Sequence, residues 1–281
     1  MGRADPGAVA AAAAPERMMA ADAPATHGSD LAVDAVYVLS VKTFSDRIAH
    51  VRRELGRHRI GFDFIFDFDA AEIDDATLRK HFGDGPPMKK QASLTLKHLQ
   101  AWRLAAARGQ RRILVFEDDV ILHPKFRARM AATLRAADAL APGWHIFLGG
   151  ADARVPDTFF LQPGPLVPLP SATADGYVSD LEACRRRVAW CERNKIALPA
   201  DQLIAHIDRN ENIAQYWLPE AVVEQGSVVG LFDSELDSIR QKHSRLYNVA
   251  RHRWTKWRRR TFRRYWVRAL HALRGGAQDS G

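Results

Sequence analysis

The chain has 281 residues, 47% hydrophobic and 26% charged, a composition typical of a globular protein that is long enough to bury a sizeable core. No apolar run approaches the roughly 20 residues of a bilayer-crossing helix, so we predict no transmembrane segment. Its two cysteines, Cys184 and Cys191, lie two turns apart on a predicted helix and too far apart to bridge, which excludes a disulfide framework and indicates a reducing compartment.

The net charge of +8 is concentrated at the C-terminal end. Residues 251–281 contain ten Lys and Arg and one acidic residue, which leaves 31 basic and 32 acidic residues in the first 250 positions. The main body is therefore nearly neutral, and the tail is the part that suggests a polyanionic partner.

The first part of the chain predicts a βαβ unit after an Ala-rich segment. We expect residues 1–30 to form a disordered leader, with a cleaved targeting segment as the alternative. A strand at 35–39, a helix at 45–58 and a strand at 62–68 predict parallel strands with a right-handed crossover. A short helix at 74–81 and a longer one at 93–108, which ends at Gly109, follow.

A strand that runs directly into three carboxylates is the most informative motif. Residues 113–116 are apolar and predict a buried strand, and Glu117, Asp118 and Asp119 follow at once. Adjacent carboxylates repel one another, so a divalent metal or basic side chains should lie there. Because ligands bind beyond the carboxyl ends of strands in open α/β sheets, one interpretation is a Mg²⁺- or Mn²⁺-dependent nucleotide site. The alternative is a solvated acidic turn.

The remaining pattern alternates helices and strands up to a basic tail. After a helix near Pro124 and a strand at 144–148, residues 151–174 predict loops or short strands, and 176–191 predict a helix. A short helix follows from 199, and strand-like residues lie within 214–223. We expect domain boundaries at 1–30, 31–245 and 246–281, the last being a basic amphipathic helix and tail. Its arginine and tryptophan content favours an anionic bilayer surface, and packing on the body or nucleic-acid binding are the alternatives.

Several motifs, in this order, resemble glycosyltransferase family 25, which includes lipooligosaccharide galactosyltransferases of bacteria. The resemblance covers about residues 35–240. The matching segments are the opening strand with Asp46-Arg47, the Lys97 to Trp102 helix, the 113–120 strand, Tyr177 to Ser179, Pro199 to Asp201, and Pro219 with Gln225. Two positions depart from the family pattern: Lys97 stands where Ser is usual, and His145 where Asp is common.

The resemblance implies an α/β protein with a single nucleotide-sugar-binding domain of the GT-A type. Its sheet should be mixed and mostly parallel, with a basic C-terminal helix appended. The implied reaction is an inverting transfer of a hexose, galactose first, from a UDP-sugar to a glycolipid such as lipopolysaccharide core. We expect a cytoplasmic enzyme, peripheral on the inner face of the bacterial inner membrane, with nucleotide sugar, glycolipid and anionic membrane as partners and no nucleic acid.

The expected roles of the candidate residues follow from this chemistry. Mn²⁺ or Mg²⁺ would contact Asp119, supported by Asp118 or Glu117, and would offset charge on the leaving diphosphate. Asp201 is the first candidate for the base that deprotonates the acceptor, or is an ordinary helix cap, and Glu224 is the weaker candidate.

Five further residues are candidates for the donor site, each with a structural alternative. His98 and Trp102 share a helix face and line the donor site or form a buried hydrogen-bonded pair. Arg47 reaches the phosphates or the carboxylates, or is a solvated arginine. Tyr177 and Ser179 contact the sugar or pack their own helix. Two other functions remain open: an inactive glycan- or membrane-binding relative, and a Mg²⁺-dependent phosphotransferase or hydrolase.

Overall fold

The computed structural model describes residues 31–83, 88–150, 153–170, 173–232 and 245–276, and residues 1–30, the predicted leader, lie outside these ranges. It is a mixed α/β structure built on a seven-stranded sheet of order β2-β1-β3-β7-β5-β8-β6. The strands of this sheet are β1 (Ala35–Leu39), β2 (Asp63–Ile65), β3 (Arg112–Glu117), β5 (Trp144–Phe147), β6 (Val167–Pro168), β7 (Gly176–Asp180) and β8 (Ala214–Trp217).

The sheet is mostly parallel, as predicted. Strands β2, β1 and β3 pair in parallel, and so do β5 and β8. Strand β7 lies between β3 and β5 and is antiparallel to both, while β6 is antiparallel to β8 at one edge. Five strands therefore point one way and two the other. The N-terminal end of β7 consequently lies beside the carboxyl ends of β1 and β3, at the edge of the sheet where these strands end.

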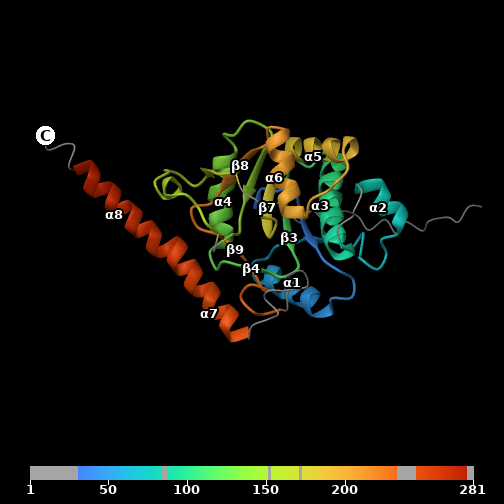
Figure 1. Ribbon diagram of the computed structural model, residues 1–281, viewed down its shortest axis with the longest axis horizontal. Coiled ribbons are helices and arrows are strands. Elements are labelled where there is room, and N and C mark those ends of the chain that lie inside the picture. Colours follow the sequence, from blue (N-terminus) through green and yellow to red (C-terminus); the bar gives the residue numbers. More distant parts are fainter. Residues whose placement is uncertain (1–30, 84–87, 151–152, 171–172, 233–244, 277–281) are drawn as a thin grey trace, which may run out of the picture.

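Helices cover both faces of the sheet (Figure 1). The helices of the body are α1 (Ser45–Arg57), α2 (Asp75–His81), α3 (Lys89–Arg108), α4 (Phe126–Ala137), α5 (Leu181–Arg193) and α6 (Ala200–Asn210), with a 3-10 turn, η2 (Asp157–Phe160). Alternate residues of β1 face opposite cores, because successive side chains of a strand point to opposite faces. Tyr37 packs with α3, α5 and α6, and Val38 packs with α1 and α4.

Local signals account for most element boundaries. Asp74 accepts a hydrogen bond from the Thr77 backbone N–H and begins α2, and Gly109, with φ of 62°, ends α3. The βαβ unit, the strand before the three acids and the helix after Pro124 form as predicted. Cys184 and Cys191 are both buried free thiols on α5, in agreement with the predicted absence of a bridge.

The prediction of one helix over 176–191 is wrong at its start. Residues 176–180 form β7, all five of them buried, and only then does α5 begin. Asp180 makes this change possible, because its carboxylate accepts a hydrogen bond from the Ala183 N–H at 2.8 Å and caps the helix. Helical spacing of apolar residues therefore continued one turn beyond the true helix.

Two smaller features complete the fold. Strand β4 (Val120–Leu122) follows the three acids directly and pairs with β9 (Val223–Gln225) in a separate two-stranded sheet. At the C-terminal end, α7 (Arg245–Lys256), a π-helical segment η4 (Trp257–Phe262) and α8 (Arg263–Gly276) form one long rod along the body (Figure 1). No helix in the described ranges combines the length and the apolar character needed to cross a bilayer.

Candidate functional site

The three acids at the end of β3 point toward three different neighbours. The Asp118 carboxylate pairs with Arg47 of α1 at 2.8 Å and accepts a hydrogen bond from the Ser40 hydroxyl at 2.9 Å. Burial raises the pKa of Asp118, although Arg47 and Ser40 act in the opposite direction. Arg47, one of the candidate donor-site residues, thus contacts the carboxylate cluster, which is one of the two roles predicted for it.

Asp119 has a carboxylate oxygen whose hydrogen-bonding capacity is unused. Its Oδ2 accepts a hydrogen bond from the Ser227 backbone N–H at 3.0 Å, and its backbone carbonyl accepts one from Gly226 at 2.6 Å. Its Oδ1 is buried and has no hydrogen-bond partner in the described structure. A buried carboxylate oxygen without a partner is costly, and a bound cation would satisfy it.

Asp175 is an additional acid at this edge that the sequence patterns did not indicate. It immediately precedes β7 and lies near the acids because Gly176 pairs with Phe116 of β3. Its carboxylate accepts hydrogen bonds from the Thr173 hydroxyl at 2.5 Å and the Gly150 N–H at 3.2 Å. Burial raises the pKa of Asp175 to about 6.

Gly149 makes room for this carboxylate. A Cβ at position 149 would lie 1.9 Å from Oδ2 of Asp175, so a side chain there would displace the acid. Glu117 lies near the Asp175 carboxylate. Burial, together with the charges of Asp119 and Asp175, raises the pKa of Glu117 well above its usual range. Glu117, Asp119 and Asp175 therefore lie close enough to one another for their charges to raise the pKa values of Glu117 and Asp175.

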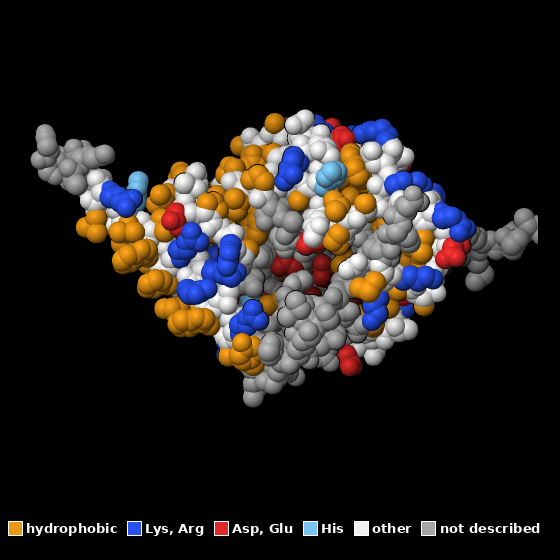
Figure 2. Space-filling model, in the orientation of Figure 1, with side chains coloured by type: hydrophobic (Ala, Val, Ile, Leu, Met, Phe, Trp, Pro, Cys, Tyr) orange, Lys and Arg blue, Asp and Glu red, His pale blue; other side chains and the backbone are white. Residues whose placement is uncertain are grey.

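Two pockets meet at Glu117. The first, of about 390 Å³, lies among β1, α1 and α3, with Leu39, Phe44 and Leu94 among its apolar lining residues. The second, of about 350 Å³, is lined by Glu117, Thr173, Asp175 and the start of α6. Figure 2 shows a hollow in this face of the molecule with acidic side chains at its floor.

The two candidate bases lie in different places. Asp201 lines the second pocket from the first turn of α6, and its carboxylate accepts a hydrogen bond from the Gln202 N–H at 2.8 Å. The residue that caps α6 is Pro199, so the capping interpretation does not apply to Asp201.

Glu224, in contrast, contacts α7 and lines neither of the two pockets. It forms an ion pair with Lys256, and its Oε2 lies 3.5 Å from Nε2 of His252. Hydrogen bonding to His252 and Lys256 lowers the pKa of Glu224 to about 2. A carboxylate with so low a pKa is a poor general base.

The other four predicted donor-site residues form a core network and line neither pocket. The Tyr177 hydroxyl lies 3.0 Å from Nδ1 of His98 and accepts a hydrogen bond from the Trp102 indole at 3.0 Å. The Ser179 hydroxyl accepts a hydrogen bond from buried Arg187 at 2.8 Å. All four side chains are completely buried. The alternative of a buried, hydrogen-bonded pair therefore describes His98 and Trp102, and a donor-site role of these four residues stays a prediction to which the described geometry adds no support.

The carboxylate oxygens at this end of the sheet suit a hard divalent cation that a substrate also binds. Among the described residues, no three acidic, imidazole or thiol side chains already surround a potential metal position. Mg²⁺ and similar ions, however, usually bind through one or two carboxylates together with water and substrate phosphates. Glu117, at the junction of the pockets, and Asp119, which lines neither pocket but lies two residues further along the chain with an unused oxygen, are the residues that would hold such an ion.

The fold and this edge define a mixed α/β domain with an acidic centre between two pockets, an arrangement compatible with a single glycosyltransferase domain. Residues 33–148 match the family model of glycosyltransferase family 25 (LPS biosynthesis protein). The resemblance inferred from the motifs is thereby confirmed. The matched segment contains Arg47 and the three acids, whereas Asp175 and Asp201 lie outside it.

Individual relatives are distant and include proteins named as inactive. A putative glycosyltransferase of Haemophilus influenzae is 30% identical over 134 residues, which are 45% of this chain and 44% of that protein. The inactive glycosyltransferase 25 family member 3 of Homo sapiens is 27% identical over 138 residues, 45% of this chain and 23% of that protein. Its Mus musculus counterpart is 25% identical over 200 residues, 66% of this chain and 33% of that protein. The chain spans less than half the length of each of these relatives.

Proposed function

We propose that the protein is an inverting glycosyltransferase that transfers a hexose, galactose being the first choice, from a UDP-sugar to a glycolipid such as lipopolysaccharide core. The observation that carries the proposal is the position of Glu117, which lines both pockets. A donor in one pocket and an acceptor in the other would meet at the acidic edge. Each pocket has the volume of a small-molecule site.

The first pocket suits the nucleotide part of the donor. Leu39, Phe44 and Leu94 offer apolar surface to a nucleobase, and the same pocket is lined by Lys90 and by Lys42, which is paired with Glu72. Asp119 and Glu117 would hold Mn²⁺ or Mg²⁺, which supplies positive charge to the leaving diphosphate. Arg47 fixes Asp118 on the opposite side and keeps that carboxylate oriented.

Asp201 supports the second half of the reaction. Its carboxylate lies in the pocket that also contains Glu117 and Asp175, where the acceptor would enter. In this proposal the Asp201 carboxylate accepts the proton of the acceptor hydroxyl, and the hydroxyl oxygen forms a bond to the anomeric carbon of the sugar. The bond between that carbon and the diphosphate oxygen breaks on the opposite face of the sugar, and UDP leaves.

The test is a panel of nucleotide sugars with and without Mn²⁺, measured by nucleotide release. We expect release from a UDP-hexose that requires the metal, is abolished by Asp119→Ala, and survives Glu192→Ala, an exposed acid on α5 that lines neither pocket. Asp201→Asn should lower transfer to acceptor while UDP still binds. Full activity in Asp119→Ala would remove the metal role from the proposal.

A second candidate is an inactive relative that keeps the fold. Two observations favour it: the mammalian relatives are named inactive, and Lys97 places a buried ammonium in the first pocket, paired with Asp69 at 2.7 Å. Calorimetry with UDP and Mn²⁺ separates the two candidates. Binding of neither would favour the inactive relative, and metal-dependent UDP binding would favour the enzyme.

A further inference from the structure

The C-terminal rod from Arg245 to Gly276 is 32 residues of continuous helix, about 48 Å long at 1.5 Å per residue. It contains eleven Lys and Arg and no acidic residue. One end of the rod extends beyond the body (Figure 1). What the rod does depends on which of its sides the body covers.

The body covers a side rich in arginine. Arg260 donates a hydrogen bond to the Gly150 carbonyl at 2.7 Å, and its guanidinium lies 5.4 Å from the centre of the Trp217 ring. Arg268 donates to the Phe160 carbonyl at 3.0 Å. Ion pairs join Lys256 to Glu224, Arg263 to Asp157 and Arg264 to Glu220. Several cations are therefore used to attach the rod to the body.

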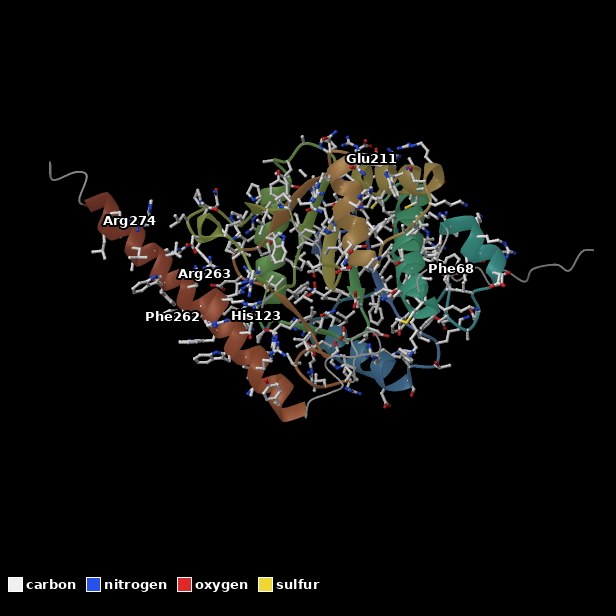
Figure 3. All side chains as sticks on the ribbon, in the orientation of Figure 1. Phe68, His123, Glu211, Phe262, Arg263 and Arg274 are labelled. Atoms are coloured by element: carbon white, nitrogen blue, oxygen red, sulfur yellow. The ribbon has the colours of Figure 1, made fainter. Side chains whose placement is uncertain are left out.

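The opposite side carries large apolar side chains in contact with solvent. We call this set the aromatic ridge: Trp254, Trp257, Phe262, Tyr265, Trp266 and Leu273, which are between 46% and 73% exposed. Figure 2 shows a row of hydrophobic side chains along the outer edge of the rod, and in Figure 3 Phe262 points away from the body. Exposed apolar surface of this extent marks an interaction site.

The π-helical segment keeps the ridge on one line. In it the Arg263 N–H bonds to the Arg258 carbonyl, five residues back, so residues five apart lie above one another. The ring centres of Trp257 and Phe262 are 5.5 Å apart as a result. Trp254 stacks on Trp257 at 5.2 Å, and Phe262 on Trp266 at 6.4 Å.

Charge decides among the possible occupants of the ridge. Arg251, Arg253, Arg258 and Arg274 are exposed on the same rod, and no acidic residue lies within it. A second copy of this rod would bring like charges together without a compensating carboxylate, which is unfavourable. Tryptophan and tyrosine beside arginine are the composition that lies at the headgroup level of anionic bilayers.

We propose that the aromatic ridge inserts into the headgroup layer of an anionic membrane and holds the rod parallel to the surface. The exposed arginines then contact lipid phosphates, while the arginines on the covered side keep the body attached. Because α7 contacts Glu224 of β9, and Gln225 of the same strand donates a hydrogen bond to Glu117, the body's pockets are connected to the membrane-bound rod. This inference does not depend on the proposed reaction.

The experiment is cosedimentation of the full-length protein with phosphatidylcholine vesicles that contain, or lack, phosphatidylglycerol. We expect binding to the anionic vesicles. A triple variant, Trp254→Ala, Trp257→Ala and Trp266→Ala, should bind about ten-fold more weakly or worse. The matched control, Met88→Ala with Leu231→Ala, removes exposed apolar side chains of the body and should bind as the wild type does. Equal melting temperatures show that each variant is folded.

Four results would overturn the proposal. Wild-type protein that stays in the supernatant with anionic vesicles has no such surface. A triple variant that binds as tightly as wild type would show that charge alone is responsible. If the wild-type protein forms a dimer and the triple variant does not, the ridge is a dimer interface. If the wild-type protein binds RNA in preference to anionic vesicles, the ridge is a nucleic-acid surface. Nucleotide release without vesicles, which the triple variant should retain, distinguishes failure here from failure of the proposed reaction.

Discussion

Asp208→Ala should be among the most destabilising single changes in the body, because it leaves a buried arginine without its carboxylate. Asp208 accepts hydrogen bonds from Arg187 Nε at 2.7 Å and Nη2 at 2.6 Å, and from Gln215 at 2.7 Å. The Arg187 and Asp208 side chains are 0% and 1% exposed. Water therefore cannot replace the lost partner.

The magnitude follows from burial. Removing one member of a buried ion pair costs about 3–5 kcal/mol, against about 5–15 kcal/mol of total stability for a typical domain. At roughly 2–4 °C per kcal/mol for a protein of this size class, the melting temperature should fall by about 6–20 °C. Replacing both members, Arg187→Met with Asp208→Leu, should recover much of this loss, because an apolar pair does not leave a buried charge.

The assay is urea denaturation at neutral pH, with the slope of the transition checked for constancy. The control is Glu211→Ala, which breaks the Arg193–Glu211 pair, whose side chains are 59% and 23% exposed. That change should cost at most about 1 kcal/mol, since exposed pairs contribute little. If Asp208→Ala costs no more than Glu211→Ala, the reasoning that this network stabilises the core is refuted.

Three further changes test the site. Tyr177→Phe removes the hydroxyl that contacts the ring nitrogens of His98 and Trp102, and should lower the free energy of unfolding by about 2–4 kcal/mol in urea denaturation. UDP binding per folded molecule should not change. Weaker UDP binding without a loss of stability would instead support a donor-site role for Tyr177. Gly149→Ala should lower the rate of the proposed sugar transfer about 100-fold, because the new Cβ displaces the Asp175 carboxylate. Adding Asp175→Ala to this variant should then lower the rate no further. Losses that add in the double variant would contradict this explanation. Because the folded protein lowers the pKa of Glu224 from 4.5 to about 2, the Glu224 carboxylate stabilises the wild type above pH 4.5, and this stabilisation is lost as the pH falls toward about 2. Glu224→Gln should lack this contribution. Acid-denaturation curves of equal shape for the two proteins would contradict it.

Elements that depend on local chemistry could be predicted from the sequence. Residues 35–39 are β1 as predicted, and Gly109 ends α3 because it adopts a positive φ. The three acids after β3 could be placed at a sheet edge because an apolar strand runs directly into them. Their individual partners could not be predicted, because Arg47 and Ser227 lie 71 and 108 positions from the acids they contact.

Asp175 could not be identified from the same patterns. The rule used for ligand sites considers the carboxyl ends of parallel strands, whereas Asp175 precedes an antiparallel strand whose N-terminal end lies at that edge. Strand β7 could not be predicted either, because Ser179 and Asp180 are polar and their partners His145 and Gly143 lie more than 30 positions away in the sequence. The β-forming pair Tyr177-Val178 after a glycine was the available signal.

The two departures from the family pattern lie in different surroundings. His145 is fully buried in the middle of β5, with Nδ1 2.8 Å from the Ser179 hydroxyl, and lines neither pocket. An aspartate lost there removes no group from either pocket. Lys97, in contrast, lies in the first pocket, where its ammonium contacts Asp69 and the Asp67 carbonyl, both at 2.7 Å. Burial lowers the pKa of Lys97, while Asp69 favours its charged form, so Lys97 is the one of these two residues that a ligand in the first pocket would contact.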